Sequence, residues 1–154
     1  MRLCGLRMMA SDSRIGAATT GDAAEIARLV CELGYEANAA TIAGRLDRLM
    51  ADPAHGIFVA RASDTALAGW IDVEHRCNLE SGSRAEIVGL IVDPHARRSG
   101  VGGALVCAAE SWASARGLGT ICVRSNVVRS ASHQFYTDCG YQTLKTQHVY
   151  AKAI

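Results

Sequence analysis

Residues 85–104 read AEIVGLIVDPHARRSGVGGA. Within them, Ile87–Val92 is apolar on both period-2 faces, which predicts a central strand covered on both sides of a sheet. Pro94 has no N–H for a strand ladder and biases Asp93 toward a turn, so the strand ends there. Arg97–Gly103 then supplies three glycines directly before a periodic segment, and the free N–H groups at a helix start favour an anion. The predicted order is strand, stop, phosphate-binding loop and helix.

Two well-known glycine loops do not match this segment. A P-loop requires a lysine and a serine or threonine after its last glycine, and no lysine follows these glycines. The dinucleotide-binding fingerprint requires a third glycine at the position that Leu105 occupies. Neither motif therefore identifies the phosphate-containing ligand of this loop.

A third pattern matches. Arg97-x-x-Gly100-x-Gly102, directly after a strand that ends at Val92, resembles the acetyl-CoA pyrophosphate loop of the GNAT N-acetyltransferase family. The second half of that family's signature follows about thirty residues later, in the family's order, as Asn126, Ala131, Phe135, Tyr136, Gly140 and Tyr141. The resemblance spans roughly Ile15–Ala151, and both halves in order are more specific than one loop alone.

Length and charge limit the alternatives. A chain of 154 residues is large enough for one domain with one core. The net charge of +1 gives no reason to expect nucleic acid, and no apolar run approaches the ~20 residues that span a bilayer. We expect a cytoplasmic protein with a flexible leader, 1–13, and a GNAT acetyltransferase domain, 14–154. The six cysteines are scattered singly, so we expect small buried hydrophobic residues rather than a metal site.

Periodicity predicts the other elements around the central strand. The expected fold class is α/β, a single-domain GNAT fold with a mixed, mostly antiparallel central sheet flanked by about four helices. We expect strands at Arg14–Thr19, Ile57–Ala60, Leu67–His75, Thr120–Arg124 and one or two within Tyr141–Ala151, and helices from an Asp22 N-cap to Gly34, over Ala40–Met50, from Val101 to Ala115 and over Ser130–Asp138.

The resemblance implies acetyl-CoA as co-substrate and no metal. It implies that the glycine loop holds the pyrophosphate, that the end of the central strand pairs with the pantetheine arm near the acetyl carbonyl, and that an asparagine bonds the arm. The expected cofactor-binding residues are Leu90, Ile91, Val92, Arg97, Arg98, Ser99, Gly100, Val101, Gly102, Gly103 and Asn126.

Acyl transfer to an amine needs a base for the acceptor and an acid for the departing thiolate. Tyr136 resembles the family's leaving-group tyrosine, and the alternative is a core tyrosine. Glu86 stands where one branch of the family has its general base, and the alternative is a strand-end charge. His75 is a second candidate for the base, because imidazole titrates near neutrality; an exposed strand-end histidine is the alternative. His55 is assigned no role.

The expected activity is transfer of an acetyl group from acetyl-CoA to a primary amine by direct attack in a ternary complex. A non-catalytic acyl-CoA-binding or sensing module is the alternative. The expected partner is a small-molecule or peptide amine, without nucleic acid or membrane, and a homodimer is possible. An acidic side would favour a cationic amine such as a polyamine, an aminoglycoside or a basic peptide N-terminus, if these carboxylates converge: Glu32, Glu36, Asp72, Glu74 and Glu80.

Overall fold

The computed structural model describes residues 13–154, so the expected leader lies outside the described residues except for Ser13. The chain divides into two compact units, one that ends at Val123 and one from Arg124 to Ile154. Each unit is described by itself. Across residues 13–154, no helix is long and apolar enough to span a membrane.

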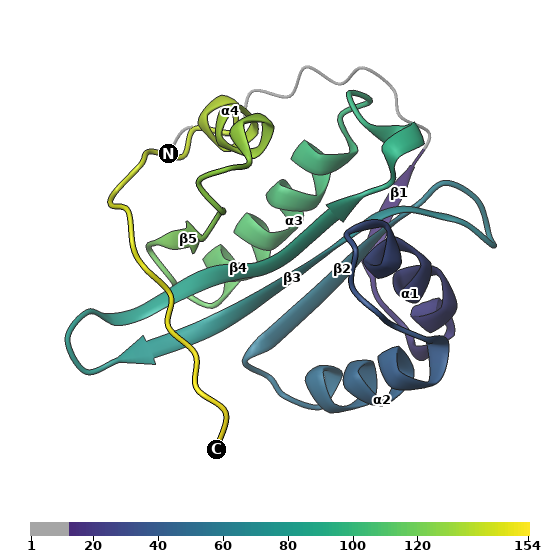
Figure 1. Cartoon of the computed structure of the whole chain (residues 1–154), viewed down its shortest axis with the longest axis horizontal. Coiled ribbons are helices and arrows are strands. Elements are labelled where there is room, and N and C mark those ends of the chain that lie inside the picture. The colour runs from purple at the N-terminus through teal and green to yellow at the C-terminus, as the bar shows by residue number, and fades with distance from the viewer. Residues whose placement is uncertain (1–12) are drawn as a thin grey trace. The chain divides into compact units, whose positions relative to one another are not determined.

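The first unit is built on a five-stranded sheet in the order β1-β2-β3-β4-β5 (Figure 1). The first four strands form an antiparallel meander, as expected, and β5 is parallel to β4. The strands are β1 (Arg14–Ala17), β2 (His55–Arg61), β3 (Leu67–Asn78), β4 (Gly82–Val92) and β5 (Ile121–Val123). The predicted hairpin between β2 and β3 is confirmed, with Ser63 accepting the backbone N–H groups of Thr65 and Ala66.

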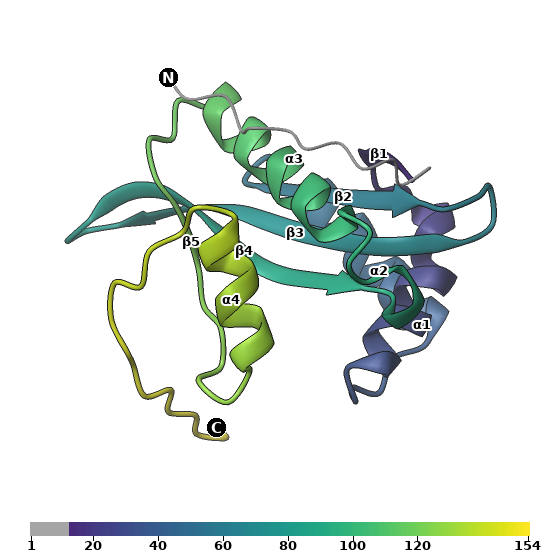
Figure 2. The ribbon, with the colours of Figure 1, turned by 90° about the horizontal axis from the view of Figure 1, so that it is seen from above.

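Three helices of the first unit cover this sheet, with α3 on one face and α1 and α2 on the other (Figure 1, Figure 2). Their bounds are α1 (Ala23–Glu32), α2 (Ala39–Met50) and α3 (Val101–Ala115). The core under α1 and α2 joins buried helix side chains to β2 and β4, with members such as Ile26, Ile42, Ile57, Val59 and Ile91. A fourth helix, α4 (Ser130–Asp138), belongs to the second unit.

Close packing of α3 on the sheet explains two glycines. A Cβ at Gly56 in β2 would stand 2.5 Å from Nε1 of Trp112, and one at Gly69 in β3 would stand 2.5 Å from the carbonyl oxygen of Ile91. Neither approach leaves room for a side chain. Since successive strand residues point to opposite faces, the α3 face of β3 carries Ile71 and the other face carries Asp72.

Several expectations need correction. Val88 is 44% exposed, so the central strand is not covered on both sides along its whole length. No strand forms between Tyr141 and Ala151, where one or two were expected, because a strand needs a partner to pair its backbone groups. Asp22 does not cap α1 with its side chain; its carboxylate accepts the N–H of Thr19 at 2.7 Å instead.

The cysteines are also less buried than expected. Cys31 and Cys77 are exposed, and three others are partly buried. Cys4 lies outside the described residues.

Candidate active site

The loop between β4 and α3 has the geometry expected of an anion cradle. We call residues 93–103 the cofactor loop. Arg98 and Gly100 adopt left-handed backbone angles, with φ of 62° and 87°, which turn the chain sharply before α3 begins at Val101. The first helical hydrogen bond that Gly100 accepts comes from Ala104 at 3.0 Å, so the N–H groups of residues 101–103 precede the helical ladder. Arg97 and Arg98 are exposed beside them.

Helix α1 anchors the start of the cofactor loop. Arg28 donates to Asp93 at 2.8 Å and to the carbonyl oxygen of Leu67 at 3.1 Å, and it also pairs with Glu25. The backbone N–H of His95, followed by the Arg28 guanidinium, lowers the pKa of Asp93 against the opposing effect of burial. The loop therefore leaves the sheet from a fixed point.

Strand β4 loses its outer neighbour just before this loop. β5 pairs with Ala85–Ile87 only, and the β3–β4 ladder has a bulge at the same place, where Val88 is the extra residue. Beyond it, Leu90, Ile91 and Val92 pair with β3 on one side, and β5 does not reach their other side. An extended amide-bearing chain can add to such an edge by backbone hydrogen bonds. The expected pantetheine-binding residues therefore lie at an open strand edge that leads into the cofactor loop.

Glu86 is buried inside β4, at 3% exposure, and is therefore not a strand-end charge. Its Oε2 lies 3.4 Å from Nη2 of Arg84 and 3.6 Å from Nε of Arg76. Nε of Arg76 also bonds Glu74, two residues before it on β3. The negative charge of Glu86 is thus paired inside the sheet, on the α1 and α2 face.

The same face continues into a histidine between two carboxylates. Nδ1 of His55 lies 3.2 Å from Oδ1 of Asp72, and Nε2 lies 3.7 Å from Oε2 of Glu74. Burial raises the pKa of Asp72, although the hydrogen bond to His55 opposes that shift. We call this connected set the polar network; its members are His55, Asp72, Glu74, Arg76, Arg84 and Glu86.

The remaining acid and base candidates of the first unit lie elsewhere. His75 is exposed and points to the other face of β3, away from Asp72 and Glu74. Glu80 lies in the exposed turn after β3, beyond the end of the strand, which is itself about 20 Å from Asp72. Glu32 and Glu36 are exposed at the end of α1 and in the connection to α2. Of the five carboxylates in the expected acidic side, the structure brings Asp72 and Glu74 together.

The second unit holds the other two predicted site residues. Tyr136 packs edge to face with Phe135, with ring centroids 5.1 Å apart, and with Tyr141, 5.7 Å apart. Burial raises the pKa of the Tyr136 phenol to about 12. Asn126 is exposed, and its Oδ1 accepts the N–H of Val128 at 3.1 Å, which leaves its side-chain NH₂ for a ligand.

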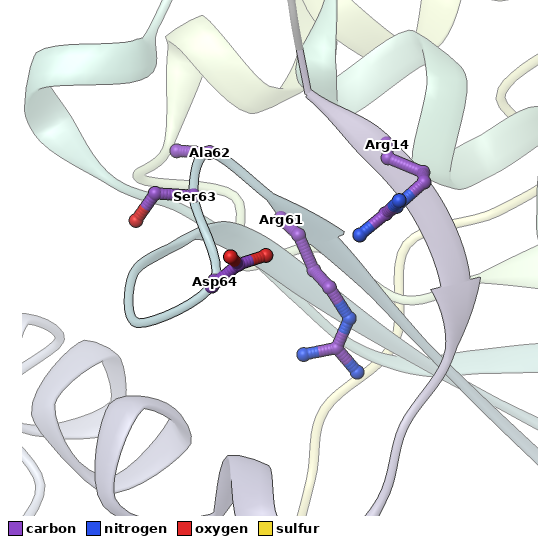
Figure 3. A pocket seen from close by; sticks show the side chains of 5 residues that line it. All are labelled: Arg14, Arg61, Ala62, Ser63 and Asp64. Carbon is purple, nitrogen blue, oxygen red and sulfur yellow. The ribbon is translucent and has the colours of Figure 1, made fainter.

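One further depression lies on β1 and β2. It has a volume of about 270 Å³ and is lined by Arg14, Arg61, Ala62, Ser63 and Asp64 (Figure 3). The Arg61 guanidinium already forms a forked pair with Asp22, with one contact of 2.8 Å. This depression contains none of the predicted site residues. Among residues 13–154, no cluster of three or more His, Cys, Asp or Glu side chains could hold a metal ion.

Glu86, Asp72 and Glu74 were named from the sequence, but their connection to His55, Arg76 and Arg84 in one polar network was not predicted. Its members come from β2, β3 and β4, and they meet only because the antiparallel register places His55 opposite Glu74 and Glu74 opposite Glu86. A signal existed in the alternation of Asp72, Glu74 and Arg76 along one face of β3.

Known proteins place the chain among enzymes. A family model described as "Acetyltransferase (GNAT) family" matches residues 24–141. The chain is 31% identical over 139 residues to an aminoglycoside N(6')-acetyltransferase type 1 of Stenotrophomonas maltophilia, covering 88% of this chain and 90% of that protein. It is 32% identical over 142 residues to the protein of the same name from Klebsiella aerogenes, covering 88% and 93%.

Solved structures agree on the fold. The crystal structure of an aminoglycoside 6'-N-acetyltransferase from Acinetobacter haemolyticus superposes with a TM-score of 0.78 at 21% identity, over 92% of this chain and 99% of that one. The loop, the open edge of β4, the family match and these relatives lead to one conclusion: the chain belongs to the GNAT acetyltransferase family.

Proposed function

We propose that this protein transfers an acetyl group from acetyl-CoA to a primary amine of a small cationic acceptor, with an aminoglycoside as the first candidate. The observation that carries the proposal is the continuity of the open β4 edge with the cofactor loop, because an acyl-CoA needs both features side by side. The names of the two relatives above 30% identity support the acceptor class.

Each part of the cofactor has a proposed partner. The N–H groups at the start of α3, with Arg97 and Arg98, bind the pyrophosphate. The outer edge of Leu90–Val92 pairs with the pantetheine amides, and Asn126 bonds the arm through its NH₂ group. The same strand N–H groups stabilise the oxyanion of the tetrahedral intermediate, which is typically worth about 3 kcal/mol.

Tyr136 is the proposed partner of the departing sulfur. With a pKa of about 12, its phenol stays protonated throughout the physiological range. Full transfer of that proton to an ordinary thiolate, whose conjugate acid has a pKa of about 8.5, would be uphill by about 5 kcal/mol. We therefore propose that Tyr136 donates a hydrogen bond to the thiolate as the carbon–sulfur bond breaks.

Glu86 takes part at a distance in this proposal. Its side chain is 5% exposed, and Glu86 lies about 13 Å along β4 from Leu90. It holds Arg76 and Arg84 in place, and Arg76 in turn bonds Glu74. Its contribution to the base therefore passes through the polar network or through water.

Calorimetry and thiol release together test the function. We expect acetyl-CoA to bind, and free thiol to appear only when an amine is added, fastest with an aminoglycoside or a polyamine. An amine panel that includes acidic amino acids checks the acceptor charge, and a preference for those acids would contradict the cationic class. Binding without thiol release across the whole panel would indicate an acyl-CoA-binding module instead.

A further inference from the structure

The polar network contains one carboxylate that stands apart from the others. We propose that Asp72, positioned by His55, is the group that binds the acceptor ammonium and takes its first proton. This inference rests on the proposed acetyl transfer and adds the residue that touches the acceptor.

Position is the first argument. The β3–β4 register puts Asp72 directly opposite Gly89, the residue before Leu90. One ladder spacing and one residue along the strand place its Cα about 6 Å from that of Leu90. The ring of Trp70, two residues before Asp72 on the same face of β3, fills the space where a Cβ of Gly89 would stand. By these backbone spacings Asp72 is about 6 Å from Leu90, the first residue of the proposed acyl-binding edge, whereas Glu86 lies about 13 Å from Leu90 along β4.

Charge is the second argument. Glu74 contacts Arg76, and Glu86 contacts both Arg76 and Arg84. Among the contacts of the described residues, Asp72 pairs with an imidazole, from His55, and with no guanidinium. An incoming ammonium would therefore supply the missing cation. The groups that face Asp72 are the His55 ring from β2 and the Glu74 carboxylate on its own strand, with the two arginines and Glu86 further along.

The third argument is the accessibility of the pair. The side chains of Asp72 and His55 are 14% and 15% exposed, so a substrate nitrogen can reach them while most solvent is excluded. Burial raises the pKa of Asp72, which brings the carboxylate closer to the proton affinity that a base requires. Nδ1 of His55 fixes the orientation of the Asp72 carboxylate from the side away from β4.

The protons balance along this route. The acceptor arrives as an ammonium and gives one proton to Asp72, and the free amine attacks the thioester carbonyl carbon. The carbon–nitrogen bond forms, the carbon–sulfur bond breaks, and the thiolate receives the second proton that leaves nitrogen. The proton on Asp72 then passes to water, so one proton is released for each ammonium acetylated.

Substitution of Asp72 tests the inference in an enzyme that first shows amine-dependent thiol release. We expect Asp72→Asn to lower kcat/KM for the amine by 100-fold or more, with the Kd for acetyl-CoA unchanged. Raising the pH, or using an acceptor amine of low pKa that is already neutral, should restore much of the rate. Asp47→Asn, an exposed change of the same kind on α2, serves as control and should keep the wild-type rate.

The outcomes separate the two proposals. A wild-type enzyme without turnover would refute the proposed function, whereas an active wild type with an equally active Asp72→Asn variant would refute only this inference. If Asp72→Asn fails to fold, Asp72→Glu keeps the charge and displaces it by one methylene. A loss of about 10-fold in that folded variant supports the inference, and wild-type kinetics overturn it.

His55 is tested as a positioning residue by two variants. His55→Gln keeps a side-chain N–H that can donate to Asp72, and His55→Leu does not. We expect His55→Leu to lose about 10-fold in kcat with little change in KM for acetyl-CoA, and His55→Gln to recover most of it. Equal rates in the two variants would overturn the positioning role.

Discussion

The cofactor loop and the polar network are two halves of one proposed site, but they are built in opposite ways. The cofactor loop is one continuous, mostly exposed segment in which backbone N–H groups and glycine angles matter most. The polar network is half-buried and consists of side chains from β2, β3 and β4. Backbone donors survive most side-chain changes, whereas an ion pair network responds to each change in charge. Substitutions that change the backbone of the cofactor loop should therefore affect cofactor binding, and substitutions that change a charge in the polar network should affect the reaction of the acceptor.

Besides the Asp72 variants, the largest effect on kcat should come from a residue outside both regions. We expect Tyr136→Phe to lower kcat by about 100-fold while the Kd for acetyl-CoA stays the same, because only a hydrogen bond to the departing sulfur is lost. Because the pKa of Tyr136 is raised to about 12, the wild type should show no loss of rate from this phenol below about pH 11. Single-turnover kinetics measure both quantities. An unchanged kcat would show that Tyr136 takes no part in the reaction.

A backbone change in the cofactor loop should act on binding. At Gly100, φ is 87°, a conformation that a β-branched residue adopts only under strain. We expect Gly100→Val to weaken acetyl-CoA binding by 10-fold or more, measured by calorimetry. Gly117→Val, at φ of 71° after α3, imposes similar strain away from the loop and should leave the Kd unchanged. Equal loss in both variants would mean that general destabilisation, and not the cradle, sets the affinity.

A charge change deep in the polar network should act mainly on stability. Glu86→Gln leaves Arg84 and Arg76 without their shared carboxylate, and we expect a loss of about 1 to 2 kcal/mol in unfolding free energy. The loss is modest because the Arg76 side chain is 38% exposed. The acidic limb of kcat/KM should keep its shape. A changed acidic limb would show that Glu86, rather than Asp72, exchanges the proton with the acceptor amine.

The effect expected to touch activity least concerns an ion pair, Asp22 with Arg61, that belongs to neither region. Burial opposes ionisation of Asp22, but hydrogen bonds from Arg61 and Thr19 outweigh it and lower the pKa of Asp22 below 3.8. This stabilisation is complete above pH 3.8 and is lost as the pH falls through the lower folded value. Asp22→Asn should therefore cost about 2 kcal/mol at pH 7 and less at pH 2 to 3. Thermal unfolding across pH checks this, and a cost that does not change with pH would contradict it.

Features that depend on residues close together in the sequence could be predicted, and features that depend on the pairing of distant strands could not. The turn at Pro94 and the helix from Val101 to Ala115 depend on local sequence, and the structure confirms both. The bulge at Val88 and the burial of Glu86 depend on the pairing of three strands, which periodicity does not specify. His55 was given no role for the same reason, since its partners are 17 and 19 positions away. The roles of Tyr136 and Asn126 stay predictions.

The contact between Gly56 and Trp112 has a consequence for how this sequence can change. A methyl group at Gly56 would collide with the indole, and the indole also carries the Arg116 guanidinium 4.0 Å above its ring. A side chain at position 56 therefore fits only if position 112 carries a residue smaller than tryptophan. In a library of variants the order of the two changes would therefore matter. A smaller residue at position 112 would make a later side chain at position 56 tolerable, whereas a side chain introduced first at position 56 would clash with Trp112 and be lost.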